Sequence, residues 1–255
     1  MKAATEEFLY LLLWSAEFLV RPSWRTVSDS FESWAYRHHL TRRLAELERL
    51  KLIESRPARD AKRVYRLTTE GRRLALAGVD PLHKWARSWD GRWRLVVFDV
   101  PETKRRDRVR LRRTLRMLGF GYLQNSVWLS PDSLETVRQL LGGTKVEVEQ
   151  LTLFEGRPCG GESDKDLVAG AWDFEKINQR YGAWNRVADS APKPVAGLFE
   201  PAKLRCWAAR ERAAWQAIVA CDPFLPEPLL PEAYPGRLAW ERRARLLNAL
   251  GQALA

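Results

Sequence analysis

One carboxylate stands where a metal-dependent nuclease would carry one. Asp99 comes near the end of the apolar run of residues 94–100, a proline follows, and an arginine-rich segment over residues 104–113 begins at once. A carboxylate at the end of a strand, beside cations that attract phosphate, could hold a divalent metal for phosphodiester hydrolysis. Such chemistry gathers several carboxylates, and the near neighbours are Glu102 and Asp107. Asp99 is therefore a candidate catalytic residue, with helix capping or an arginine pair as the alternative roles.

A second set of side chains, further upstream, suits contact with DNA. The spacing of Leu40, Leu44 and Leu47 predicts a helix over about residues 34–50 with one buried stripe. A helix with an apolar back and a basic front can enter the major groove, and a basic hairpin tip can reach the adjacent phosphates. The candidate DNA-contacting residues are Arg37, His38, Thr41 and Arg42 on the helix and Arg56, Arg59, Lys62 and Arg63 in the basic turn that follows.

The elements that must position these residues form a winged helix-turn-helix domain over residues 1–78. Three helices are expected first, then two strands around the basic turn, then a fourth helix. The helices are expected at residues 6–20, after a cap at Ser23, at residues 34–50, and from Thr68 onward. The strands are expected at residues 51–55 and 64–67. A winged helix that binds a protein instead of DNA is the alternative.

No metal site, cofactor or disulfide framework is expected. The three cysteines have neither paired nor metal-binding spacing, which fits a reducing cytoplasm; they are Cys159, Cys206 and Cys221. His38 and His39 have no cysteine or carboxylate at ligand spacing, so surface or phosphate contact is the expected role of both.

Composition points to a folded protein with an anionic partner. The chain has 255 residues, 45% of them hydrophobic, and 12 tryptophans. Its formal net charge is +11, which favours nucleic acid as the partner. Residues 1–78 carry 15 Lys or Arg against 10 Asp or Glu, and residues 79–155 carry 14 against 10, so the excess lies in the first two-thirds. The apolar run at residues 8–20 is too short to span a bilayer, so no membrane partner is expected.

Residues 79–155 are predicted to form a ferredoxin-like domain of the order β-α-β-α-β. Its strands are expected at residues 94–100, 122–129 and 145–154, and its helices at 103–118 and 130–141. Three arginines recur every four residues on the first of these helices and make a cationic stripe: Arg108, Arg112 and Arg116. The stripe could contact the DNA backbone, form salt bridges across a dimer, or remain solvated.

Residues 156–255 are predicted to form a mainly α-helical domain. Helices are expected at residues 166–188, 202–220 and 236–254. Between the last two, the proline-rich run over residues 222–231 is expected to be an extended strap, because proline removes backbone donors and clashes inside helices. The whole chain is thus expected to be an α+β multidomain protein, with boundaries at 1–78, 79–155 and 156–255.

The central segment resembles a known family. Three consecutive features are similar to the CRISPR-associated protein 2 family: the motif "LVVFDVPE", the arginine-rich helix that follows it, and the motif "LGFGYLQNSVWLSP". In that family the residue that matches Asp99 is a candidate metal ligand shared across a dimer. The same module occurs within PaaX-type transcriptional repressors. The winged helix, the Trp-Asp-Gly-Arg-Trp motif at 89–93 and "CDPFLPEPLLPEAYPG" at 221–236 resemble the PaaX type over nearly the whole chain.

This resemblance implies a cytoplasmic, homodimeric repressor that binds double-stranded operator DNA and is not an enzyme. It also implies release from DNA by an aryl- or acyl-coenzyme A thioester, although the sequence assigns no effector-binding residues. The competing function is a metal-dependent nuclease or nucleic-acid-processing factor that uses Asp99.

Overall fold

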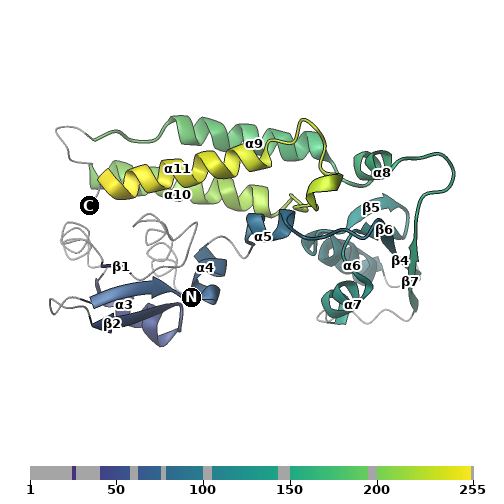
Figure 1. Cartoon of the computed structure of the whole chain (residues 1–255), viewed down its shortest axis with the longest axis horizontal. Coiled ribbons are helices and arrows are strands. Elements are labelled where there is room, and N and C mark those ends of the chain that lie inside the picture. The colour runs from purple at the N-terminus through teal and green to yellow at the C-terminus, as the bar shows by residue number, and fades with distance from the viewer. Residues whose placement is uncertain are drawn as a thin grey trace. The chain divides into compact units, whose positions relative to one another are not determined.

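The computed structural model describes residues 25–26, 41–57, 63–75, 79–99, 105–142, 150–194 and 200–253. The chain divides into two compact units, each built from segments far apart in the sequence (Figure 1). One comprises Met1–Asp80, Tyr181–Gln216 and Pro235–Ala255, and the other comprises Pro81–Arg180 and Ala217–Tyr234. No helix in the described part of the chain is long and apolar enough to cross a membrane.

The first unit contains one helix, a hairpin and a second helix of the expected winged helix. These are α3 (Thr41–Arg49), the antiparallel strands β2 (Ile53–Pro57) and β3 (Arg63–Leu67), and α4 (Thr69–Ala75). Strand β1 (Arg25–Thr26) pairs with β3, which gives the sheet order β1-β3-β2. Leu47 is fully buried, as the leucine stripe predicts. The two helices expected upstream, and Leu40, lie outside the described residues.

Strand β2 begins two residues later than predicted. Lys51 adopts a left-handed backbone conformation, with φ at 56°, directly after α3. This conformation ends a helix by satisfying its last carbonyl groups, and the Lys51 and Leu52 amides donate to carbonyls of Glu48 and Leu47. Lys51 and Leu52 therefore belong to the helix stop, and pairing with β3 starts at Ile53.

The second unit is built around a four-stranded antiparallel sheet. In chain order its elements are α5 (Pro81–Trp85), β4 (Trp93–Asp99), α6 (Arg105–Met117), β5 (Gly121–Gln124), β6 (Val127–Ser130), α7 (Leu134–Gly142) and β7 (Gln150–Gly156). The strand order β5-β6-β4-β7, with one helix after β4 and another after β6, is that of a ferredoxin-like fold.

The single strand predicted at residues 122–129 is wrong, because this segment is the hairpin β5–β6. Asn125 takes a left-handed conformation, with φ at 42°, and Asn125 and Ser126 form the two-residue turn. Asparagine tolerates this conformation better than other residues with a side chain, which makes it a common hairpin-turn residue. The hairpin supplies the fourth strand of the sheet.

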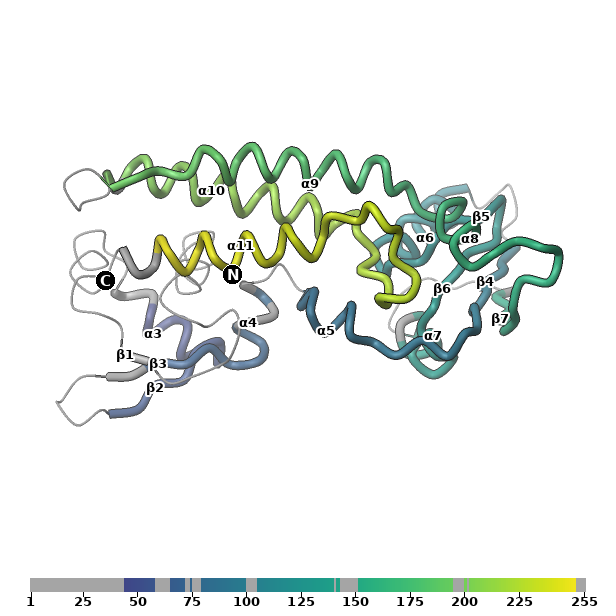
Figure 2. The backbone as a smooth tube through the Cα atoms, turned by 45° about the horizontal axis from the view of Figure 1, so that its top comes forward, coloured from purple at the N-terminus to yellow at the C-terminus, as the bar shows by residue number. Residues whose placement is uncertain are grey.

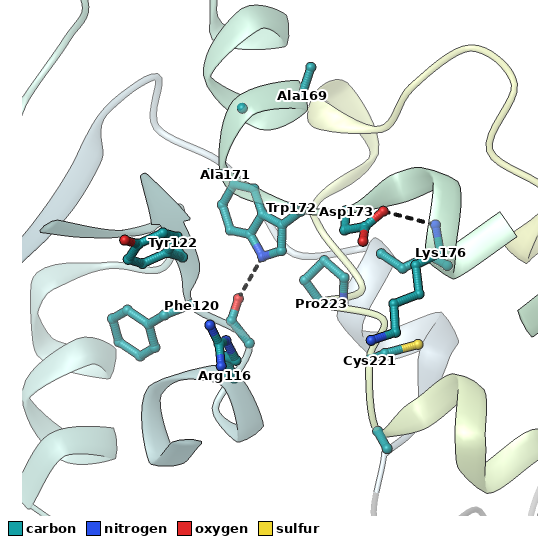
Figure 3. Close-up of a pocket in the computed structure, with 14 residues that line it drawn as sticks. Arg116, Phe120, Tyr122, Ala169, Ala171, Trp172, Asp173, Lys176, Cys221 and Pro223 are labelled. Carbon is teal, nitrogen blue, oxygen red and sulfur yellow. Dashed lines mark hydrogen bonds between the residues drawn. The ribbon is translucent and has the colours of Figure 1, made fainter. Parts of the chain in front are cut away.

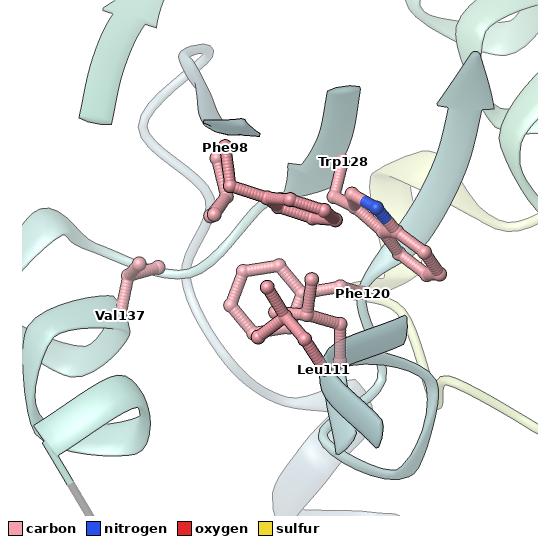
Figure 4. Close-up of a cluster of buried hydrophobic side chains, with 7 residues drawn as sticks. Phe98, Leu111, Phe120, Trp128 and Val137 are labelled. Atoms are coloured by element: carbon pink, nitrogen blue, oxygen red, sulfur yellow. The ribbon is translucent and has the colours of Figure 1, made fainter. Parts of the chain in front are cut away.

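One face of the sheet packs on α6 and α7. Figure 4 shows this core, in which aromatic side chains from the strands meet aliphatic side chains of the helices. Its buried residues are Val96, Phe98, Leu111, Leu115, Phe120, Trp128 and Val137. Leu111 and Leu115 are the apolar positions that the helix pattern predicts. Alternate residues of β4 point to this face, as the period of a strand requires.

The other face of the sheet is covered by segments from much later in the chain. Helix α8 (Asp164–Ala171) lies against β5 (Figure 2), and the strap that contains the 3-10 turn η2 (Glu227–Leu229) lies beside α8. Trp93 and Leu129 of the sheet form a second core with Trp172 and the strap residue Leu225. Gly121 permits the approach, because a Cβ atom there would lie 2.7 Å from the Trp172 ring.

The helix predicted at residues 166–188 is two helices, α8 and α9 (Phe174–Asp189). Trp172 leaves the helical conformation, with φ at −127° and ψ at 137°, and its indole Nε1 donates to the Gly119 carbonyl at 3.1 Å. Asp173 then accepts the Lys176 amide at 2.9 Å, as an N-terminal helix cap does. The continuous-helix prediction failed because the packing of one tryptophan interrupts the helix.

Three long helices lie side by side in both views: α9, α10 (Pro201–Val219) and α11 (Gly236–Ala253) (Figures 1 and 2). Within the first unit, tryptophans fill the space among them. Trp184 and Trp215 have ring centroids 5.5 Å apart, and Trp215 and Trp240 are 5.6 Å apart. The predicted core positions of α10 are all buried, namely Leu204, Trp207, Trp215 and Ile218.

Candidate DNA-binding and effector-binding sites

Most of the predicted DNA-contacting side chains lie outside the described residues. Arg37, His38, Arg59 and Lys62 fall in those segments, and only the backbone is described for Thr41, Arg42 and Arg63. Thr41 and Arg42 begin α3, and Arg63 begins β3. Arg56 is exposed on β2, one residue before the strand ends. Its partner across the hairpin is Val64, which places Arg56 at the end of the hairpin that carries the basic turn.

The hairpin is fixed to α4 by close backbone contacts. The Thr68 hydroxyl donates to the Lys51 carbonyl at 2.8 Å and accepts the Gly71 amide at 3.0 Å, so it caps α4. A Cβ atom on Gly71 would lie 1.9 Å from the Leu52 carbonyl oxygen. Only glycine therefore fits at this position, which explains the Thr-Thr-Glu-Gly sequence at the start of the helix.

The described surroundings of Asp99 do not resemble a nuclease centre. Asp99 is exposed at the end of β4, opposite Gln150 of β7. Among the described residues, no group of three or more His, Cys, Asp or Glu side chains could hold a metal ion. Asp107 lies in the first turn of α6, and Glu102 falls outside the described residues. The nuclease alternative therefore gains no support from this part of the chain.

Helix α6 presents arginines on two different sides. It contains seven arginines and one carboxylate, Asp107, in 13 residues. Arg108 and Arg112, two members of the predicted stripe, are half-buried, and Arg112 donates to the Asn125 carbonyl at 3.0 Å. Arg116, the third member, is exposed but lies 5.6 Å from the centre of the Trp128 ring. Two of the three arginines in the predicted stripe, Arg112 and Arg116, therefore contact the β5–β6 hairpin.

The fully outward side of α6 carries a different set. We call it the outer arginine face; it consists of Arg105, Arg106, Arg110 and Arg113, which are all exposed. Two apolar side chains are exposed on the same helix, Val109 at 60% and Met117 at 66%. Within the described part of the chain, no ion pair or hydrogen bond involves these four guanidinium groups.

A cavity of about 770 Å³ lies in the second unit, between the end of α6, the break between α8 and α9, and the start of the strap (Figure 3). Cavities of this size are typical of sites for small ligands. Phe120, Tyr122 and Trp172 supply aromatic walls, and two cations, Arg116 and Lys176, stand at its border. The arrangement suits a ligand that has both an apolar part and an anionic part.

A thiol also borders the cavity. Cys221 is half-buried, and burial raises the pKa of its thiol, with the nearby Asp222 carboxylate acting in the same direction. Lys176 opposes this shift, and Figure 3 shows the two side chains close together. The Cys221 thiol is therefore protonated at neutral pH and is a poor nucleophile. It contributes to the wall of the cavity and is not suited to covalent catalysis.

The Trp-Asp-Gly-Arg-Trp motif forms a charged turn that leads into β4. Asp90 accepts two bonds from the buried Arg94 guanidinium, at 2.8 and 2.6 Å, and one from the Arg92 amide. Gly91 between them has φ at 74°, a conformation that favours glycine. Arg94 also pairs with Glu155 of β7 at 2.9 Å. The hydrogen bond from Arg94 is the largest cause that lowers the pKa of Asp90.

The "CDPFLPEPLLPEAYPG" motif is explained by a hydrogen-bonded chain that fastens the strap. Trp85 of α5 donates to the Tyr234 hydroxyl at 3.2 Å, and Tyr234 donates to Asp222 at 2.7 Å. Asp222 also accepts the Phe224 amide at 2.7 Å, which holds Phe224 in a left-handed conformation with φ at 47°. Sequence reasoning did not single out Asp222 or Tyr234, and their spacing in the motif was the available signal.

Arg87 adds a second fastening. Its guanidinium pairs with Asp132, just before α7, and donates to the Phe224 carbonyl at 2.8 Å. It thereby joins the segment before β4, the ferredoxin-like domain and the strap within the second unit. The strap contains the 3-10 turn η2, whereas the sequence predicted no helical turn there.

Two models of known protein families match adjacent parts of the chain. Residues 86–168 match the model of the PaaX protein central Cas2-like domain, which identifies the sheet and its helices as a Cas2-like domain. Residues 172–253 match the model of the PaaX-like protein C-terminal domain. The chain therefore belongs to the PaaX family, as its motifs predict, and the family indicates a transcriptional regulator.

A solved structure is similar over almost the full length. It is an uncharacterized protein, Rv0674, from Mycobacterium tuberculosis, with 22% sequence identity, a TM-score of 0.54 and coverage of 96% of both chains. At this identity the likeness establishes the fold alone. A comparison with curated protein sequences found no significant match.

Proposed function

We propose that this protein is a DNA-binding transcriptional repressor that a small-molecule effector releases from its operator. The observation that supports this most directly is the adjacent pair of PaaX-family matches, over residues 86–168 and 172–253. They follow α3 and the β2–β3 hairpin, the elements that would supply a recognition helix and a wing. The formal net charge of +11 suits a polyanionic partner.

The proposed DNA contacts are those of the winged helix. Arg37, His38, Thr41 and Arg42 would face the major groove, and Arg56, Arg59, Lys62 and Arg63 would reach the neighbouring phosphates. The exposed position of Arg56 at the end of β2 is compatible with this role.

Removing charge from the wing tests this assignment. The variant R59Q/K62Q/R63Q should bind duplex DNA more weakly, and the slope of log affinity against log salt should fall by up to about 3, because each phosphate contact contributes about 0.9. Fluorescence anisotropy with labelled duplex DNA measures both quantities. The control R157Q/K193Q/R210Q removes the same charge from exposed positions elsewhere. The assignment fails if wild type binds DNA and the wing variant keeps its affinity and slope.

The repressor would act as a homodimer, since two winged helices can read the two halves of an inverted operator. Phe154 supports a contact surface on the sheet. It is 55% exposed on β7 and lies opposite Leu95 of β4, on the face of the sheet away from α6 and α7. A dimer contact on this face of the sheet would remove the Phe154 ring from water. Sedimentation of the free protein measures the oligomeric state.

The effector would occupy the cavity beside Trp172. An aryl or acyl group would contact the aromatic walls, and the phosphates of a coenzyme A moiety would lie near Arg116 and Lys176. The cavity borders both α6 and the start of the strap, so an occupant would contact elements from both matched domains. Preferential binding of the effector to the DNA-free conformation would then lower DNA affinity.

A further inference from the structure

We infer that the outer arginine face of α6 is a second DNA-binding surface, which contacts the phosphate backbone of duplex DNA independently of sequence. The inference rests on the proposed function, because it assumes that DNA is the partner. It goes beyond that function by placing a DNA contact on the central domain, where the winged-helix assignment puts none.

The geometry of the helix gathers the charge on one side. With 100° per residue, the four positions Arg105, Arg106, Arg110 and Arg113 fall within an arc of about 140°. The buried Leu111 and Leu115 lie on the opposite side, against the sheet. With a rise of 1.5 Å per residue, the backbone positions of the four arginines span about 12 Å along the helix axis. Duplex DNA carries about seven phosphate charges over the same length.

The described part of the protein does not neutralise this face. Within the described residues none of its four guanidinium groups makes an ion pair, while arginines elsewhere in the same unit do, such as Arg87 with Asp132 and Arg92 with Glu155. Like charges three and four residues apart destabilise a helix, and Arg106–Arg110 and Arg110–Arg113 have these spacings. An external anion would relieve this repulsion.

The chemistry of the face favours a phosphate backbone. All four side chains are arginine, whose planar fork binds phosphate oxygens with two hydrogen bonds. A second copy of the chain could not cover the surface with its own α6, because that would bring eight guanidinium groups together. Charge complementarity therefore selects a polyanion, and the proposed function supplies duplex DNA.

The test uses the full-length variant R105Q/R106Q/R110Q/R113Q, which leaves the cavity residue Arg116 intact. The control R138Q/R157Q/K193Q/R210Q removes the same number of charges from exposed, dispersed positions. Binding to a random-sequence duplex is measured by anisotropy between about 50 and 200 mM salt. We expect the α6 variant to bind at least tenfold more weakly, with a salt slope smaller by about two to four, and the control to retain both within error. The thermal midpoint of the α6 variant should equal or exceed that of wild type.

The outcomes separate this inference from the proposed function. If the wing variant R59Q/K62Q/R63Q loses DNA binding while the α6 variant matches its control, the inference is wrong and the winged-helix assignment stands. If the α6 variant loses binding and the wing variant does not, the inference stands without the winged-helix assignment. If the α6 variant loses affinity for single-stranded RNA but not for duplex DNA, the surface binds RNA and the inference is overturned.

Discussion

Among the described residues of the first unit, the most deeply buried charges are a pair surrounded by tryptophans. Glu211 is 0% exposed and Arg243 is 1% exposed, and the Arg243 Nε donates to Glu211 at 2.7 Å. Trp184 donates its indole hydrogen to the same carboxylate at 2.8 Å, and the Arg243 guanidinium lies 4.5 Å from the centre of the Trp215 ring. The desolvated charges are thus compensated by each other and by aromatic groups on three helices.

Removing one partner of this pair should destabilise the protein strongly. We expect R243M to lower the free energy of unfolding by about 3–5 kcal/mol, because Glu211 would remain buried without its cation. The double variant E211M/R243M should recover much of this loss, since neither charge would then be buried alone. Urea unfolding of the three proteins measures the differences. A double variant less stable than R243M would contradict this explanation.

Residues of this kind are hard to predict from the sequence. Glu211 and Arg243 lie on different helices, and charged residues on a helix usually face solvent. The aromatic neighbours were predictable, because Trp184 and Trp215 occur at helical spacing with other apolar residues. Pairing across helices depends on how the helices pack, and local sequence does not contain that information.

Elements formed by short-range patterns were predicted well. The leucines of α6 and the aromatic residues of α9 and α10 have helical spacing, and their burial agrees with it. Two of the errors, the β5–β6 hairpin and the break between α8 and α9, concern interruptions of a predicted element. Asn125 and Asp173 carried local signals for a turn and a cap. Trp172 and the sheet packing, which decided the break, did not.

The turn before β4 should make stability depend on pH. The pKa of Asp90 is lowered in the folded protein, chiefly by the hydrogen bond from Arg94. The ionised carboxylate therefore adds stability at pH values above its ordinary pKa of about 4. This stability is lost as the pH falls through the pKa of Asp90 in the folded protein. We expect D90N to be less stable than wild type near neutral pH, by about 1 kcal/mol or less because Asp90 is largely exposed. Thermal unfolding from about pH 7 to pH 3 measures the difference. The two proteins should converge at low pH, and a difference that is constant with pH would contradict this role.

At the scale of the molecule, the cavity beside Trp172 is assembled from segments about 100 residues apart, from Arg116 to Pro223. Its components are a helix end, a helix break and a strap, and the sequence alone assigned no pocket because none of its residues forms a recognised ligand motif. Family membership, by contrast, was visible in motifs that span the chain. The motifs were informative because each one fixes a turn or fastening that the fold requires.

A ligand for this cavity should stabilise the protein through Lys176. We expect one or more acyl- or aryl-coenzyme A thioesters to raise the thermal midpoint of wild type by about 5–10 °C near saturation. The shift should be reduced in K176Q and retained in R186Q, which removes an exposed cation ten residues further along α9. Differential scanning fluorimetry measures both, with free coenzyme A and the free acids as separate arms. Equal shifts in K176Q and wild type would place the ligand elsewhere.

The strap that covers the second face of the sheet also bears on how the chain folds during synthesis. Trp93 and Leu129 emerge from the ribosome long before Leu225 and Leu229, which complete their core. One apolar face of the central sheet therefore stays incomplete until the chain has been synthesised as far as Leu230. A nascent chain that stops before Tyr234 also lacks the hydroxyl that links Trp85 to Asp222. Synthesis of the strap thus acts as a checkpoint, since only a chain that extends past Leu230 can close both cores of the central domain.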